Sequence, residues 1–299
     1  MKSLFWNAEE ERLRAGWRIT LFVLIASILA IPVAELVDTF DRFLEVTFTN
    51  ALIMIVILGS IWFSGRYLDK RSWAGFGITF KPYRQFVLGA ITGFGLVVVI
   101  FAIQFGLGWL SVDMVQFNTL PAYSFLVVFA GQVLRYLAGS VFEEAFTRGY
   151  LLKNIAEGIY GRFDPTKATI IAYIITSSIF GILHMGNDNA TLLSVLNLIL
   201  LGVAFGWMVI VTGKLHFAIG FHAFWNIAQN NIFGSANSGK EPVVSWLYFN
   251  NSGADVWTGG SFGPEGGLLC TIIVSLFIAG AVQSHLKKNG RLEQNIIAE

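Results

Sequence analysis

Long apolar runs separated by short polar connections dominate the hydropathy pattern of the chain. A helix needs about 20 predominantly apolar residues to cross the ~30 Å hydrocarbon core of a bilayer, because all its backbone polar groups must be satisfied within the segment. Eight runs meet this requirement. They cover residues 17–37, 46–64, 86–110, 124–150, 168–185, 192–212, 215–233 and 266–284. The pattern therefore predicts an all-α, polytopic integral membrane protein with about eight transmembrane helices.

The apolar runs follow one another without a long polar linker, so we expect a single transmembrane domain over residues 1–299. Composition agrees, because 55% hydrophobic and only 13% charged residues lie far outside the range of soluble globular domains. The three acids at 9–11 and the lack of a small-residue cleavage site argue against a cleaved signal peptide, and the first helix is expected to remain in the mature protein.

Lysine and arginine alternate between rich and poor connections, which predicts the orientation. The basic groups gather at the N-terminus, in the connections after the second, fourth and sixth spans, and in the tail (Lys2, Arg12, Arg14, Arg18, Arg66, Lys70, Arg71, Lys81, Arg84, Lys153, Arg162, Lys167, Lys214, Lys287, Lys288, Arg291). We therefore expect both termini to be cytoplasmic, in a bacterial inner membrane. The net charge of +1 provides no basic face, so membrane lipid is the expected partner and nucleic acid is not.

The fourth span contains ionisable groups, which are expensive inside a membrane unless they are paired or face a cavity. Glu144 and Arg148 are four residues apart and share one helix face, so they can neutralise each other. Glu143 is rotated by about 100° from Glu144 and needs a partner from another helix. The alternative is that both acids lie in water at the cytoplasmic end of the helix.

Two further spans carry histidine. His184 ends the fifth span, whereas His222 and Asn226 are four residues apart in the seventh and project from one face. Such a pair can hold one water, metal ion or substrate oxygen, although a single histidine on an apolar helix is often only a hydrogen-bonded structural residue. His216 and His285 adjoin lysines near span ends, so we expect them to be interfacial.

A carboxylate, two imidazoles and an amide can hydrolyse an amide bond by two routes. They can bind zinc, or the carboxylate can activate a water while imidazole and amide stabilise the oxyanion. The chain lacks both the His-Glu-x-x-His motif of soluble zinc proteases and the Gly-x-Ser-x-Gly elbow of serine hydrolases. The single Cys270 lies in an apolar run, which excludes an internal disulfide framework.

The ordered set Glu143-Glu144-x-x-x-Arg148, Phe180-x-x-x-His184 and His222-x-x-x-Asn226 resembles the motifs of the CPBP family of CAAX prenyl proteases and bacteriocin-processing or immunity membrane proteins. The resemblance implies an intramembrane endopeptidase with a core at about 124–233. It also implies catalytic roles for Glu143, His184, His222 and Asn226, with Glu144 and Arg148 as structural support. Glu143, His184 and His222 are the possible metal ligands, so the expected cofactor is none or one divalent ion, with zinc possible.

The resemblance leaves the substrate open: a prenylated CAAX protein, another membrane-anchored peptide, or a self-made bacteriocin. Rival functions are a non-catalytic scaffold or immunity protein of the same fold and a proton-coupled transporter. Arg135 and Glu35 also lie within spans and receive no role. Counting places Glu143 near the cytoplasmic end of its span and His184 near the outer end of the next, so these helices must be staggered or extended. Gly202 and Gly206 are expected to pack helices within the chain.

Overall fold

The computed structural model describes residues 4–8, 10–79, 81, 83–292 and 294–297, and most of them are helical. Lys2, which counts toward the basic N-terminus, lies outside the described residues. The α-helices are α1 (Ala15–Val37), α2 (Arg42–Ser64), α3 (Tyr83–Gly106), α4 (Phe125–Glu144), α5 (Leu152–Ile159), α6 (Pro165–Ile182), α7 (Leu192–Thr212), α8 (His216–Asn226), α9 (Asp255–Thr258) and α10 (Leu268–Asn289). The π-segments are η1 (Gly65–Asp69), η3 (Ala145–Leu151) and η4 (Ile227–Ile232), and the 3₁₀ turns are η2 (Ala74–Phe76), η5 (Gly260–Phe262) and η6 (Pro264–Gly266).

Seven helices in the described part of the chain are long and apolar enough to cross a membrane, which confirms the expected polytopic helical fold. They are α1, α2 with η1, α3, the continuous helix from α4 to α5, α6, α7 and α10. The predicted span at 215–233 is also helical, but α8 and η4 contribute only 11 and 6 residues. This shorter helix packs against α3, α4 and α7, so it is covered by other helices.

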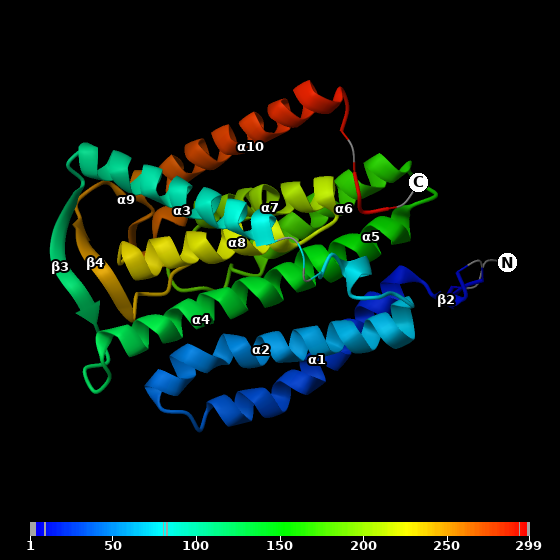
Figure 1. Cartoon of the computed structure of the whole chain (residues 1–299), viewed down its shortest axis with the longest axis horizontal. Coiled ribbons are helices and arrows are strands. Elements are labelled where there is room, and N and C mark those ends of the chain that lie inside the picture. Colours follow the sequence, from blue (N-terminus) through cyan, green and yellow to red (C-terminus); the bar gives the residue numbers. More distant parts are fainter. Residues whose placement is uncertain (1–3, 9, 80, 82, 293, 298–299) are drawn as a thin grey trace.

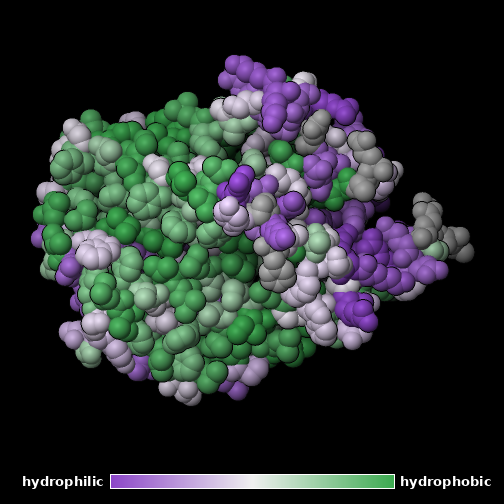
Figure 2. All heavy atoms as spheres, in the orientation of Figure 1, coloured by the Kyte–Doolittle hydropathy of each residue, from purple (hydrophilic) through white to green (hydrophobic). Residues whose placement is uncertain are grey.

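Helix α1 begins and α10 ends at the same end of the bundle (Figure 1). Hydrophilic residues gather at that end, whereas hydrophobic residues cover most of the visible face of the rest (Figure 2). Lys287 and Lys288 in the last turn of α10 belong to the hydrophilic end. If the shorter helix of α8 and η4 is counted as an eighth crossing, the number of crossings is even, which is consistent with both termini at one end. The cytoplasmic location of the termini stays a prediction.

The helix that carries the two glutamates is longer than predicted. The apolar pattern placed its end at residue 150, but α4 continues through η3 and α5, and the helix covers Phe125–Ile159. The boundary was wrong because Lys153 and Glu157 resemble solvated loop residues, whereas they bond to neighbouring segments. Glu143 therefore lies near the middle of its helix, which satisfies the expectation that helices must be extended for Glu143 and His184 to meet.

Two small antiparallel sheets are additions to the predicted all-helical fold: β1 (Trp6–Asn7) with β2 (Arg12–Leu13), and β3 (Leu110–Asn118) with β4 (Val244–Asn251). The second sheet closes the end of the bundle opposite the termini (Figure 1). The prediction that helix extends to residue 110 was wrong, because α3 ends at Gly106 and Gly108 adopts a φ of 73°. Aromatic and β-branched residues in β4 favour the strand.

Glycine allows α3 and α8 to pack backbone against backbone. A Cβ atom at Gly93 would lie 2.2 Å from the carbonyl oxygen of Phe221, and one at Gly220 would lie 2.1 Å from that of Phe86. Real Cβ atoms do not approach oxygen so closely, so only glycine fits at these crossings. This contact fixes α8, which carries His222.

A network of buried ion pairs connects α1, η1 and α5 at the hydrophilic end of the bundle. Arg18 of α1 donates to Asp69 at 2.8 Å and to Glu157 of α5 at 3.1 Å, and Arg71 also pairs with Glu157. Arg71 is thereby tied to α5, and through Glu157 to α1. Desolvation offsets most of the attraction in such pairs, so their main consequence is that removing one partner leaves an uncompensated buried charge.

Candidate active site

The neighbouring glutamates of α4 have different environments. Glu144 is fully buried, and its Oε1 accepts hydrogen bonds from Arg148 at 3.1 Å and from Nδ1 of His222 at 3.0 Å. The side chain of Glu143 is 28% exposed, and its Oε2 lies 3.8 Å from Nε2 of His222. Helical rotation separates the two carboxylates, as the sequence predicts. Glu144 therefore has fixed partners, whereas Glu143 keeps an accessible carboxylate.

Arg148 joins three helices. Its Nη1 donates to Glu144 and to Oγ1 of Thr147 at 2.7 Å, and its Nη2 donates to the carbonyl of Gly202 on α7 at 2.9 Å. The guanidinium also lies 4.6 Å from the ring centroid of Phe180 on α6. A Cβ at Gly202 would approach Nη2 to 3.0 Å, so the glycine leaves room for the arginine. Glu144 and Arg148 are thus buried beside the site and do not line its cavity, and their role as structural support stays a prediction.

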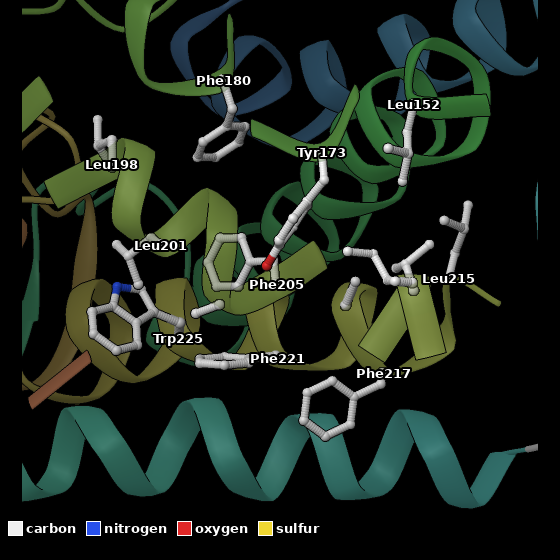
Figure 3. Close-up of a cluster of buried hydrophobic side chains, with 14 of the residues drawn as sticks. Leu152, Tyr173, Phe180, Leu198, Leu201, Phe205, Leu215, Phe217, Phe221 and Trp225 are labelled. Carbon is white, nitrogen blue, oxygen red and sulfur yellow. The ribbon is translucent and has the colours of Figure 1, made fainter. Parts of the chain in front are cut away.

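His222 is held between aromatic rings and carboxylates. Its ring stacks on Phe205 at 4.6 Å between centroids and meets Phe180 edge-on at 5.7 Å. Phe205 in turn lies between Phe180 and Phe221 in the buried aromatic cluster (Figure 3). Since Nδ1 faces the Glu144 carboxylate, Nδ1 carries a proton and Nε2 is directed toward Glu143. Packing and hydrogen bonding together fix the orientation of the imidazole.

His184 lies in the turn that follows α6, beside the ring of Phe180 at 4.9 Å. Its Nδ1 is 2.7 Å from the carbonyl oxygen of Phe180. A carbonyl can only accept, so Nδ1 carries the proton and Nε2 is free to accept a hydrogen bond from water. The half-buried ring can therefore orient a water molecule.

Asn226 offers a donor to the same region. Its Oδ1 accepts a hydrogen bond from Nδ2 of Asn237 at 3.0 Å, which leaves its own Nδ2 available to donate. Asn237 is held by the buried Glu265 at 3.4 Å. The side-chain amide of Asn226 is thus oriented by a neighbour from the connection between η4 and β4.

One cavity of about 240 Å³ brings these groups together. All four predicted catalytic side chains line it: Glu143, His184, His222 and Asn226. They come from α4, the turn after α6, and α8, which are separate segments of the chain. The residues that continue the lining toward the β3–β4 end include Asn50, Arg135, Asn187, Asn237, Ser238, Lys240 and Glu265.

Glu265 is a residue of this cavity that the sequence-based prediction missed. It is 2% exposed, and its carboxylate accepts hydrogen bonds from Nε1 of Trp225 at 3.0 Å and from the backbone and hydroxyl of Ser238, both at 2.8 Å. The only sequence signal is a lone acid in the Gly-Pro-Glu-Gly-Gly stretch before the last apolar run. These bonds fasten the connection at 237–240 against α8.

π-Helical segments follow both site-bearing parts of α4 and α8. η3 begins directly after Glu144 and contains Arg148, and η4 begins directly after Asn226. Single π-turns within α-helices often occur at functional sites, because they change the direction of side chains on either side. Here η3 lies between Glu143 and the C-terminal end of its helix, and η4 follows Asn226 directly.

The donor set does not form a ready metal site. In the residues that the structure describes, no three His, Cys, Asp or Glu side chains are grouped so that they could hold one ion. Nδ1 of His222 donates to Glu144 and leaves Nε2 as the atom that could bind an ion, whereas Asn226 is a poor zinc ligand.

The fold and the cavity define a helical membrane protein with a polar site between its helices. Within this class, residues 125–228 match the family described as Type II CAAX prenyl endopeptidase Rce1-like. The match confirms the resemblance to the CPBP family that the ordered motifs carry, and at the family level it supports an intramembrane protease. No curated protein and no solved structure matches the chain.

Proposed function

We propose that the protein is an intramembrane endopeptidase in which Glu143 activates the attacking water. The observation that carries this proposal is the convergence of Glu143, His184, His222 and Asn226 on one cavity. Glu143 is the cavity's accessible carboxylate on α4, and Nε2 of His184 accepts a hydrogen bond from the same water in this scheme. A positioned general base typically contributes 10²- to 10⁴-fold to such a rate.

In the proposed reaction, Glu143 takes a proton from water while the water oxygen attacks the carbonyl carbon of the scissile bond. The resulting oxyanion is held by Nδ2 of Asn226 and by Nε2 of His222. Glu143 then gives its proton to the amide nitrogen, the C–N bond breaks, and an acid and an amine leave. Each atom of the added water is accounted for in these two products.

The charges that directly neighbour His222 support its role. Two carboxylates, Glu143 and Glu144, face one guanidinium and one imidazole. A protonated His222 makes this group neutral overall, and buried charges are stable only when they are compensated. As an imidazolium, His222 donates from Nδ1 to Glu144 and from Nε2 to the oxyanion. Glu144 thus orients the histidine and stabilises its charge.

The proposed substrate is a membrane-anchored or lipidated peptide, because the site lies among helices that are long and apolar enough to span a bilayer. Prenylated CAAX proteins are one candidate within this class, by analogy with the matched family. A lipid anchor would concentrate a peptide at the membrane and reduce the search for the site to two dimensions.

The test is cleavage of a mixed library of membrane-anchored and prenylated peptides by purified protein. Wild type, Glu143→Gln and Glu241→Gln are compared, because Glu241 is exposed and does not line the cavity. We expect products from wild type and Glu241→Gln only, with cleavage that persists in the presence of a chelator. Equal cleavage by Glu143→Gln would refute the role of Glu143, and loss of cleavage in the chelator would refute the metal-independent scheme.

A further inference from the structure

A hollow of about 480 Å³ lies at the end of α2 and η1, apart from the cavity that holds the four polar side chains. This end of α2 belongs to the hydrophilic end of the bundle (Figures 1 and 2). The described residues that line the hollow are basic, aromatic, aliphatic, glycine or serine, and none of them is acidic: Ile61, Trp62, Gly65, Arg66, Lys70, Arg71, Ser72, Trp73 and Phe76. Three cations thus meet at one concave surface, which favours the binding of an anion.

Two of these cations are compensated weakly or not at all by the protein. Arg66 is exposed, and it forms no ion pair with an acid of the described residues. Nζ of Lys70 lies 3.8 Å from Glu11, and both side chains are largely exposed, so water and salt screen their attraction. Both basic side chains are therefore available to pair with an external anion.

Arg71, the third cation, shares its acidic partner with two other arginines. Its Nη2 pairs with Glu157, which also accepts from Arg12 at 3.3 Å and from Arg18 at 3.1 Å. Arg12 and Arg18 each have a second acidic partner, whereas Arg71 forms no other ion pair in the described part of the chain. Nη1 of Arg71 is buried and has no hydrogen-bond partner among the residues that the structure describes. Because a buried donor without a partner is costly, an acceptor that enters the hollow would stabilise this arginine.

Glycines and tertiary hydrogen bonds shape the hollow before any ligand binds. A Cβ atom at Gly65 would lie 2.8 Å from the carbonyl oxygen of Arg71 and 2.9 Å from the ring of Phe76. One at Gly75 would overlap the side chain of Arg71. The backbone N–H of Arg71 donates to the carbonyl of Gly65 at 2.8 Å, and Lys153 of α5 donates to that of Gly75 at 2.7 Å. The turn that carries the basic residues is therefore held in place by its neighbours.

Exposed aromatic residues place the hollow at the level of lipid headgroups. Trp62 and Trp73 line it, Tyr67 meets Trp62 edge-on at 6.5 Å between ring centroids, and all three are exposed. Tryptophan and tyrosine concentrate at the boundary between hydrocarbon and water, where lipid headgroups lie. Ile55 and Phe63 of α2 add exposed apolar surface. The hollow therefore joins a basic group to a surface that suits acyl chains.

We propose that the hollow binds the phosphate of an anionic phospholipid, with Arg66, Lys70 and Arg71 as its basic partners. The acyl chains extend along the exposed apolar face of α2. A phospholipid is the occupant, rather than free phosphate, because Ile61 and Trp62 continue the lining onto this apolar face. A basic residue near an anionic membrane surface strengthens the attraction about fivefold. The site does not rest on the proposed function.

Lipid binding to the purified full-length protein in a neutral detergent tests the site. The protein is titrated with radiolabelled phosphatidylglycerol and, separately, with radiolabelled phosphatidylcholine that has the same acyl chains, and the lipid retained by the protein is measured. We expect phosphatidylglycerol to bind at least about fivefold more tightly than phosphatidylcholine. A further titration with phosphatidylglycerol contains inorganic phosphate, and its reference contains chloride at the same ionic strength. The two should give the same lipid affinity.

Substitutions assign the lipid preference to residues. Arg66→Gln and Lys70→Gln should each weaken the binding of phosphatidylglycerol about fivefold and leave that of phosphatidylcholine unchanged. Both side chains are exposed, so the unfolding temperatures without added lipid should equal that of wild type. Arg162→Gln is the matched control, because Arg162 is exposed and lines a different hollow, which also contains Glu10 and Glu157.

Each outcome decides for or against the lipid site. Equal affinity for the two lipids, or equal weakening by Arg66→Gln and Arg162→Gln, would overturn it, since either result indicates no specific recognition at the hollow. Displacement of the lipid by inorganic phosphate beyond the effect of chloride would overturn the assignment to a phospholipid. Weakening confined to Arg66→Gln and Lys70→Gln supports the site, whether or not the protein cleaves peptides.

Discussion

Glu144→Gln should strongly destabilise the fold, because it removes the anionic partner of a buried arginine. Glu144 and Arg148 have no exposed side-chain surface, and their hydrogen bond is 3.1 Å long. After the substitution, Arg148 keeps only neutral partners, which include the oxygens of Thr147 and Gly202 and the ring of Phe180. Removing one member of a buried ion pair costs about 3–5 kcal/mol in free energy of unfolding, since the remaining charge is uncompensated.

The neighbouring Glu143→Gln provides the matched comparison. Its carboxylate is 28% exposed and its nearest cationic partner is an imidazole at 3.8 Å. We expect this variant to change the free energy of unfolding by less than about 1 kcal/mol. Equilibrium unfolding of both variants in mixed detergent micelles measures the difference. Equal stability of the two would refute the assignment of a structural role to Glu144 and a chemical role to Glu143.

A double substitution checks the physical cause. Glu144→Gln combined with Arg148→Met removes both charges, and an apolar replacement of a buried pair is often close to neutral. The double variant should therefore be more stable than the sum of the two single effects predicts, by about 2–3 kcal/mol of coupling free energy. Additive effects would show that the two residues do not act as a pair.

Three further predictions concern packing, catalysis and orientation. Gly93→Leu should destabilise the protein by about 1–3 kcal/mol or more through overpacking against α8. Gly95→Leu on the same helix should not, because a Cβ there meets no atom within 4 Å. Equal unfolding temperatures of the two variants would contradict this prediction. Asn226→Ala should lower kcat about 10²- to 10³-fold with little change in KM, and a change confined to KM would argue against an oxyanion role. A membrane-impermeant maleimide should label Lys240→Cys in intact cells and Lys167→Cys only after lysis; the reverse pattern would invert the predicted orientation.

The transmembrane helices and the grouping of the motifs could be predicted because both depend on local periodicity. Apolar length fixes the spans, and spacing of four residues places Glu144 beside Arg148 on one helix face. The prediction that Gly202 and Gly206 pack helices within the chain is confirmed, since Cβ atoms there would meet Ser177 and Tyr173 of α6. That the four polar side chains share one cavity was expected from the resemblance, whereas their catalytic roles stay predictions.

Features that depend on distant contacts could not be predicted. Strands β3 and β4 pair in space, but several helices lie between them in the sequence. Neither strand shows a distinct pattern alone. The partner of His222 is Glu144 at 3.0 Å, whereas periodicity indicated only Arg148 for that acid. Glu265 was missed because its partners come from α8 and the following connection. Glu35 is exposed near the end of α1, and nothing in the structure explains it.

The most direct test of the central claim is the cleavage rate of Glu143→Gln relative to wild type on one peptide that the library identifies, with the unfolding temperature measured on the same preparations. If Glu143 activates the water, the rate should fall about 10²- to 10⁴-fold while the unfolding temperature stays unchanged. Retention of the wild-type rate, or a loss of rate that accompanies an equal loss of folded protein, would contradict a catalytic role for Glu143.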